Sequence, residues 1–158
     1  MLDLVFQNFT KDKSFKRDFF ARVMSEGIKE LNLKDKGVEI SLNLVDQSKI
    51  RKLNRDYRLK DKATDVLSFP MLEKLEIRDS KLEIVDLGDI FICLPVAKND
   101  AKSENVSIEK KLAQLTAHGF LHLAGYDHPD DEVSGPRLKR RGEKMESLEN
   151  KILKVSGF

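Results

Sequence analysis

The stretch His118–His128, HGFLHLAGYDH, contains all three histidines of this chain of 158 residues. His118 and His122 are four positions apart. On an α-helix this spacing puts both rings on one face, with their Cβ atoms about 5–6 Å from each other. Gly125 can take the left-handed conformation that ends a helix, after which the chain turns back. We therefore expect His128 to return toward the first two imidazoles.

Three imidazole nitrogens that meet at one point form a metal site. Zinc binds histidine nitrogen at about 2.0–2.1 Å, and three protein ligands leave a fourth tetrahedral position open, which is typical of a catalytic zinc ion. Three imidazoles also accept nickel, copper or iron, so geometry and availability alone favour zinc. The plainer alternative is helix-surface and loop histidines without a ligand. Their concentration around a glycine favours His118, His122 and His128 as ligands of one metal ion.

The spacing also matches the metzincin signature His-Glu-x-x-His-x-x-Gly-x-x-His at every position except one. Gly119 stands where those proteases carry their general-base glutamate, so the metal ligands are present and the base for peptide cleavage is missing. The remaining candidates for a base are Asp127, water activated by the metal, and the 2′-hydroxyl of an RNA substrate. Asp127 can equally hold a histidine ring or cap the loop, and we favour such a structural role.

Length and composition indicate one soluble domain over residues 1–158. With 40% apolar and 35% charged residues, the chain is too hydrophobic to be disordered and too charged to lie in a membrane. The sole cysteine, Cys93, lies in an apolar run and is interpreted as a buried packing residue, which suggests a reducing cytoplasm. The amino terminus lacks the basic and apolar regions of a secretion signal. The net charge of +2 gives no general attraction for nucleic acid.

Apolar periodicity predicts an α+β fold with a small mixed sheet of about four strands packed with about five helices. The expected strands cover residues 2–6, 38–44, 64–69 and 84–94, and the expected helices cover residues 14–31, 46–57, 95–103, 107–124 and 136–155. Strand 64–69 is predicted to run antiparallel to strand 84–94, because the charged connection 71–83 shows no clear helical period.

Helix 46–57 is expected to begin at Asp46, a good N-cap residue, and to turn Ile50, Leu53 and Tyr57 inward. The stretch from residue 49 to residue 62 contains only two acidic residues, Asp56 and Asp61. Its seven basic residues are Lys49, Arg51, Lys52, Arg55, Arg58, Lys60 and Lys62. Charge pattern alone favours a solvated helix face.

Four separated stretches, Leu53–Arg58, Thr64–Pro70, Leu87–Ile90 and His118–His128, together closely resemble the YbeY family of bacterial endoribonucleases, also called rRNA maturation factors. The resemblance covers residues 42–128 in order. It implies a metal-dependent endoribonuclease, usually with zinc, that is directed at single-stranded RNA. It further implies a role in 16S rRNA 3′-end maturation and ribosome quality control, with the ribosome or ribosomal proteins as partners.

The resemblance also assigns residues. It implies that His118, His122 and His128 hold the metal, with His118 catalytic, and that Arg58 is the functional arginine. The planar guanidinium of an arginine suits a phosphate, and Arg55 would join Arg58 in binding RNA. Without the resemblance, a salt bridge from Arg58 to Asp61 or Asp65 would be the simpler interpretation.

Three hypotheses therefore stand at this point. The first is a zinc endoribonuclease. The second is a metal-dependent hydrolase of another class, such as a peptidase or amidase, which the metzincin spacing supports and Gly119 opposes. The third is a ribosome-associated RNA-binding protein with a structural metal, in which the basic face around Arg55 and Arg58 holds RNA.

Overall fold

The computed structural model describes residues 1–72, 77, 81–126 and 136–158, and for 136–141 only the backbone. Its centre is a four-stranded sheet in the order β1-β2-β4-β3. The strands are β1 (Leu2–Asn8), β2 (Gly37–Val45), β3 (Val66–Pro70) and β4 (Ile84–Cys93). β1, β2 and β4 are parallel, whereas β3 runs antiparallel to β4. The sheet is therefore mixed, and the predicted pairing of β3 with β4 is confirmed.

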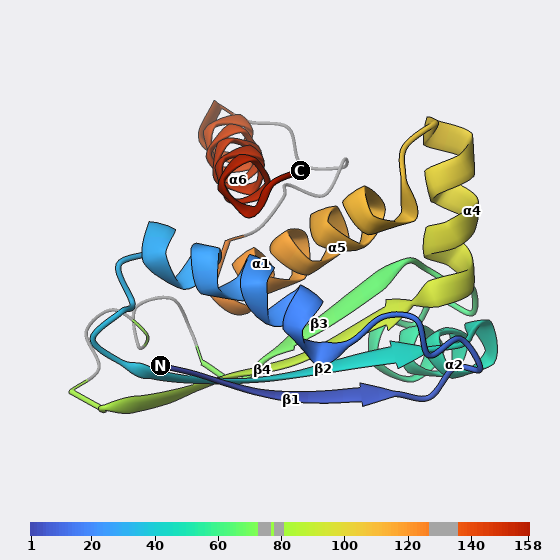
Figure 1. Cartoon of the computed structure of the whole chain (residues 1–158), viewed down its shortest axis with the longest axis horizontal. Helices are drawn as coiled ribbons and strands as arrows, with labels where there is room; N and C mark the ends of the chain where they lie inside the picture. Colours follow the sequence, from blue (N-terminus) through green and yellow to red (C-terminus); the bar gives the residue numbers. More distant parts are fainter. Residues whose placement is uncertain (73–76, 78–80, 127–135) are drawn as a thin grey trace.

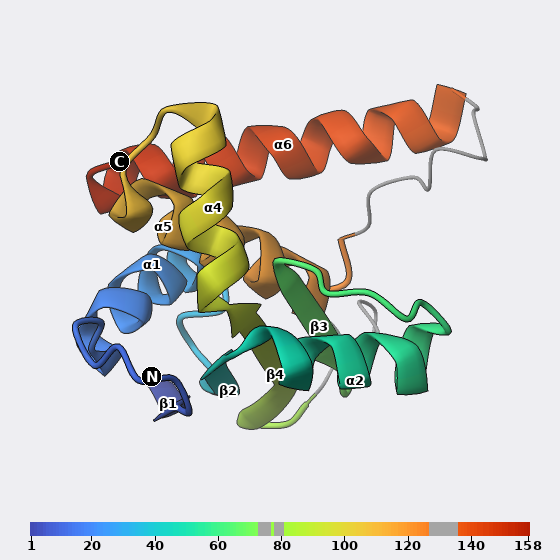
Figure 2. The ribbon, with the colours of Figure 1, turned by 90° about the vertical axis from the view of Figure 1, so that its right-hand side faces the viewer.

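Five helices lie in the described part of the chain and complete the predicted α+β fold: α1 (Arg17–Glu30), α2 (Gln47–Arg58), α4 (Leu94–Glu104), α5 (Ile108–Leu123) and α6 (Pro136–Ser156). α1 and α5 cover one face of the sheet, and α6 packs on these two helices from outside (Figure 1). α2 packs against the other face (Figure 2). Among the described residues, no helix is both long and apolar enough to cross a membrane.

Two predicted caps start their helices. The Asp46 side chain accepts a hydrogen bond from the backbone N–H of Lys49 at 3.0 Å and begins α2. The Ser107 hydroxyl accepts one from the backbone N–H of Lys110 at 3.1 Å and begins α5. Each cap satisfies a backbone donor that the first turn of a helix leaves without a partner.

The main core lies between the sheet and the pair α1 and α5. Phe20 of α1 and Phe120 of α5 are both fully buried there. Gly27 lets the two helices approach closely, because a Cβ atom at this position would lie 2.5 Å from the Phe120 ring. The glycine that weakens α1 by its propensity therefore has a packing role.

A smaller core lies under α2 and consists of Val45, Ile50, Leu67 and Cys93. It explains why β2 is not half-buried along its length as alternation predicted, since every residue from Leu42 to Val45 is buried. Burial raises the pKa of the Cys93 thiol, and the residue packs as predicted.

A bulge in β4 shapes the centre of the sheet. Glu39 of β2 pairs with Asp86, but the next residue, Ile40, pairs with Gly88, so Leu87 is an extra residue. Gly88 has a φ of 116°, and a Cβ atom there would collide with the carbonyl oxygen of Phe69. Glycine is the residue that this conformation and this close approach allow.

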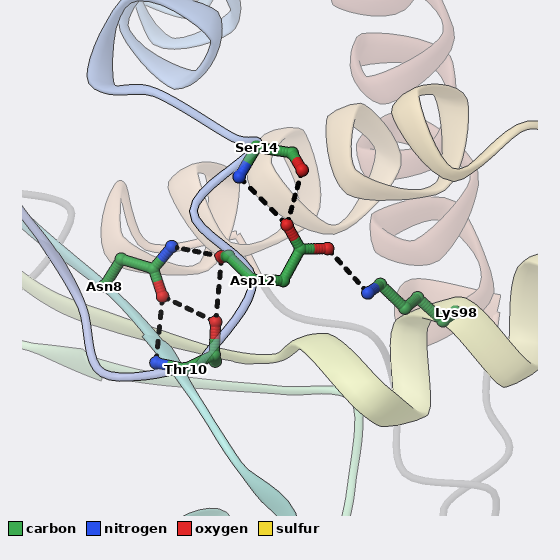
Figure 3. A network of polar contacts seen from close by, with 5 residues as sticks. All are labelled: Asn8, Thr10, Asp12, Ser14 and Lys98. Atoms are coloured by element: carbon green, nitrogen blue, oxygen red, sulfur yellow. Dashed lines mark hydrogen bonds and ion pairs between the residues drawn. The ribbon is translucent and has the colours of Figure 1, made fainter.

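A polar network fixes the loop between β1 and α1 to α4 (Figure 3). Lys98 of α4 donates to Asp12 at 2.6 Å, and the backbone N–H of Ser14 donates to the same carboxylate at 2.9 Å. Asn8 accepts from the backbone N–H of Thr10 at 2.9 Å. The hydrogen bond from Lys98, followed by those from Ser14, holds the pKa of Asp12 well below its ordinary value.

Candidate active site

The C-terminal end of α5 forms the turn that the sequence predicted. Gly125 has a φ of 89°. Its backbone N–H donates to the carbonyl of His122 at 3.0 Å, and that of Tyr126 donates to Leu121 at 2.9 Å. These two bonds and the left-handed glycine make a Schellman motif, in which the buried Tyr126 follows the glycine. The motif ends α5 directly after the second histidine.

His118 and His122 form a close pair on one face of α5, as their spacing predicted. Their ring centroids are 4.5 Å apart with an angle of 76° between the planes. The Nε2 atoms of the two rings face each other at 2.9 Å. Two ring nitrogens are therefore directed at the same small region.

Glu149 of α6 holds the other side of the His118 ring. Its Oε1 lies 2.6 Å from His118 Nδ1, and the two side chains are 20% and 28% exposed. A carboxylate only accepts hydrogen bonds, so Nδ1 carries the hydrogen, and Nε2 of a neutral His118 presents its lone pair toward His122. A carboxylate behind a histidine ring is the usual support of a metal-binding imidazole.

The separation of the two histidine nitrogens is compatible with binding one metal ion. A tetrahedral ion bound at about 2.0–2.1 Å needs its two nitrogens about 3.3 Å apart, only slightly more than the present separation. His128 and Asp127 lie outside the described residues. Among the described residues, no group of three histidine, cysteine or carboxylate side chains is placed to hold an ion. The three-histidine site therefore stays a prediction.

Gly119 faces the sheet and not the histidine pair. A Cβ atom at this position would lie 3.1 Å from Ile90 Cγ2 and 3.2 Å from Ser68 Oγ. The Ser68 hydroxyl donates to the Gly119 carbonyl at 3.4 Å, which ties α5 to β3. The glycine is thus explained by close packing between α5 and the sheet, and a glutamate side chain here would meet buried apolar atoms.

Arg58 is exposed and is the last residue of α2, the helix that packs on the face of the sheet opposite α5 (Figure 2). Within the part of the chain that the structure describes, it forms no ion pair. Asp61 is bound instead by Arg51, at 2.9 Å, and Asp65 accepts from the backbone N–H of Val66 at 2.7 Å. Arg58 is therefore paired with neither Asp61 nor Asp65. Arg55, also exposed, lies 3.4 Å from its neighbour Asp56.

Two side chains of α2 are not exposed or buried as the sequence pattern predicted. Tyr57, which we expected inward, is 69% exposed. Asn54, which no sequence signal marked, is 1% exposed, and its Nδ2 donates to the carbonyl of Lys62 at 2.9 Å. Asparagine mid-helix carries no signal for burial, because only the fold of the following loop supplies its partner.

The chain is an α+β protein whose helix α5 carries a pair of histidines in contact with each other. The sequence pattern of the family described as "Endoribonuclease YbeY" matches residues 5–157, well beyond the stretches that suggested the resemblance. The chain belongs to this YbeY family of endoribonucleases. Membership places it among RNA-cleaving hydrolases.

Individual relatives agree with this assignment. An endoribonuclease YbeY of Bacillus cereus is 40% identical over 132 residues, which cover 80% of this chain and 82% of the relative. One of Pseudomonas entomophila is 41% identical over 119 residues, 75% of this chain and 68% of the relative. The solution structure of a Thermotoga maritima protein matches with a TM-score of 0.57 and 28% identity, covering 97% of this chain and 91% of that one.

Proposed function

We propose that the protein is a zinc-dependent endoribonuclease that cuts single-stranded RNA in the cytoplasm. Its role would be 16S rRNA 3′-end maturation and ribosome quality control, with the ribosome or ribosomal proteins as partners. Family membership supports the RNA-cleaving activity. The observation that carries the metal is the orientation of His118, whose Nδ1 contacts Glu149 at 2.6 Å while its Nε2 lies 2.9 Å from that of His122.

His118, His122 and His128 would hold the ion. When bound, zinc supplies a Lewis acid at a phosphoryl oxygen. The contact with Glu149 keeps His118 in the tautomer that binds a metal through Nε2, so the ring needs little reorganisation. Loss of His118 should therefore abolish cleavage.

Arg58 would bind the phosphate of the RNA. A guanidinium can donate two parallel hydrogen bonds to a phosphate of the strand. The exposed guanidinium of Arg58 is available for this, because no carboxylate in the described part of the chain neutralises it. Arg55 would add attraction for the backbone of the same strand.

Purified protein, loaded with zinc, should be tested on single-stranded RNA beside His118→Ala, Arg58→Ala and Lys102→Ala. We expect the first two variants to lose cleavage and Arg58→Ala to keep its zinc. Lys102→Ala, which removes one exposed positive charge from α4, should cut as the wild type does.

Each alternative has its own outcome in this experiment. Unchanged cleavage by His118→Ala would identify a contaminating nuclease. Salt-sensitive RNA binding without cleavage, preserved after metal removal, would indicate an RNA-binding protein with a structural metal. Peptide or amide turnover that a chelator abolishes would indicate a peptidase or amidase, although Gly119 stands where such an enzyme carries its base and a Cβ atom there would lie only 3.1 Å from Ile90.

A further inference from the structure

Tyr57 is an exposed aromatic residue whose ring packs against partly buried phenylalanines. Its ring makes an edge contact with Phe69 of β3, at 5.2 Å between centroids and 64° between planes. Phe69 in turn contacts Phe91 of β4 at 5.8 Å and 78°. Both phenylalanines are partly buried against the small core under α2. Tyr57 is thus fixed at its base while 69% of the residue remains accessible.

The surroundings of this ring are positively charged and already ordered. Seven basic residues and two acidic ones lie between Lys49 and Lys62. Both carboxylates have arginine partners, Asp56 with Arg55 and Asp61 with Arg51. Arg58 and Lys60 form no ion pair in the described part of the chain, so their charges are available to an anion.

The backbone next to Tyr57 is held by the buried Asn54. Its side-chain Nδ2 donates to the carbonyl of Lys62, and its backbone carbonyl accepts from the backbone N–H of Lys60 at 3.2 Å. Leu59 ends α2 in the left-handed conformation, with a φ of 58°. The surface is therefore preorganised, which lowers the entropic cost of binding a flexible partner.

We propose that Tyr57 is a stacking platform for one base of the RNA strand, with Arg58 and Lys60 binding the adjacent phosphates. This inference rests on the proposed function and adds the means by which single strands are selected. A base in a duplex is already stacked and paired, whereas an unpaired base offers its face to an aromatic ring. A supported, accessible ring within a basic surface fits a partner with both flat bases and negative charge better than it fits a protein.

The test is a binding measurement with two strands. The first is a short single-stranded 2′-O-methyl RNA, checked on a gel for integrity, and the second has the same backbone with abasic positions. Replacing a stacking aromatic by alanine costs about 1–3 kcal/mol per base, so Tyr57→Ala should bind the first strand about 5- to 150-fold more weakly. On the abasic strand the same variant should bind as the wild type does.

Two controls accompany this measurement. Tyr57→Phe keeps a ring and should bind within about two-fold of the wild type, because stacking needs only the aromatic face. Phe9→Ala removes another aromatic, which is 63% exposed and donates its backbone N–H to Leu44, close to the start of α2, and this variant should leave the affinity unchanged. A Tyr57→Ala protein that melts at the wild-type temperature confirms that the fold is intact.

Tyrosine fluorescence gives a second, direct readout. The chain has two tyrosines and no tryptophan, and the other tyrosine, Tyr126, is only 7% exposed. Binding of the first strand should quench a component of the emission that Tyr57→Phe lacks. The abasic strand should produce little of this quenching.

The outcomes separate this inference from the proposed function. Wild-type protein that neither binds nor cuts RNA would overturn both. Wild-type protein that cuts RNA while Tyr57→Ala binds both strands normally would overturn only the stacking platform. If that variant instead lost a ribosomal protein in a pull-down and kept its RNA affinity, the surface would belong to a protein partner, and our proposal would be wrong.

Discussion

Glu149 is the side chain whose replacement best tests the histidine site. Glu149→Gln keeps the size of the side chain but removes the charge from the hydrogen bond to His118 Nδ1, which is 2.6 Å long between two mostly buried groups. A hydrogen bond to a charged group contributes about 1.5–3 kcal/mol. If Glu149→Gln no longer supports the His118 ring in this way, the zinc affinity of the variant should fall about 10- to 100-fold, since about 1.4 kcal/mol corresponds to ten-fold.

The assay is competition for zinc with a chromophoric chelator, using wild type, Glu149→Gln, Glu149→Ala and Glu146→Gln. Glu146 is an exposed residue of the same helix, so its variant matches the loss of charge without touching the histidine. In the metal-free protein, nuclear magnetic resonance of the imidazole nitrogens should show His118 protonated at Nδ1 in the wild type and a mixture of tautomers in Glu149→Ala. Glu149 variants with wild-type zinc affinity and an unchanged tautomer would refute the reasoning.

Three further replacements test the fold that carries the site. Gly27→Ala gains about 1 kcal/mol of helix propensity, but its Cβ overlaps the Phe120 ring at a cost of about 1–3 kcal/mol. Urea unfolding should therefore show a lower free energy of unfolding for the variant, and a higher one would contradict the packing argument. Gly88→Ala should lower the free energy of unfolding by about 2–4 kcal/mol, because alanine is strained at this φ and its Cβ collides with Phe69. If Gly88→Ala destabilised the protein less than Gly157→Ala, where the added Cβ meets no other atom, the argument from this close contact would be wrong. The lowered pKa of Asp12 adds stability above its ordinary pKa of 3.8 that is lost as the pH falls below it. The gap in melting temperature between wild type and Asp12→Asn should therefore narrow in acid, and parallel pH curves would exclude this contribution.

Local signals in the sequence identified much of the fold. Asp46 and Ser107 cap helices through hydrogen bonds to residues three positions away, so their roles are visible in a short window. Gly125 acts through the same few residues. The pairing of His118 with His122 likewise follows from helical geometry alone.

Features that join distant segments could not be predicted in this way. Glu149 is 31 residues from His118 in sequence, and α6 shows many charged residues among which none is marked as a partner. Tyr57 has the spacing of an inward residue, but the small core under α2 includes Phe69 and not Tyr57, which stays exposed. The reason for glycine at position 119 depends on where Ile90 and Ser68 lie in the sheet. Each of these is a property of the assembled layers.

The position of Glu149 in α6 has a consequence for the folding of the chain during its synthesis. Translation proceeds from α5 to α6, so His118 and His122 leave the ribosome before the carboxylate that orients them. A nascent chain that has completed α5 therefore carries the histidine pair without its support. α6 packs on α1 and α5 and brings Glu149 to His118, so the histidine ring is oriented only once this last helix has been made and has docked.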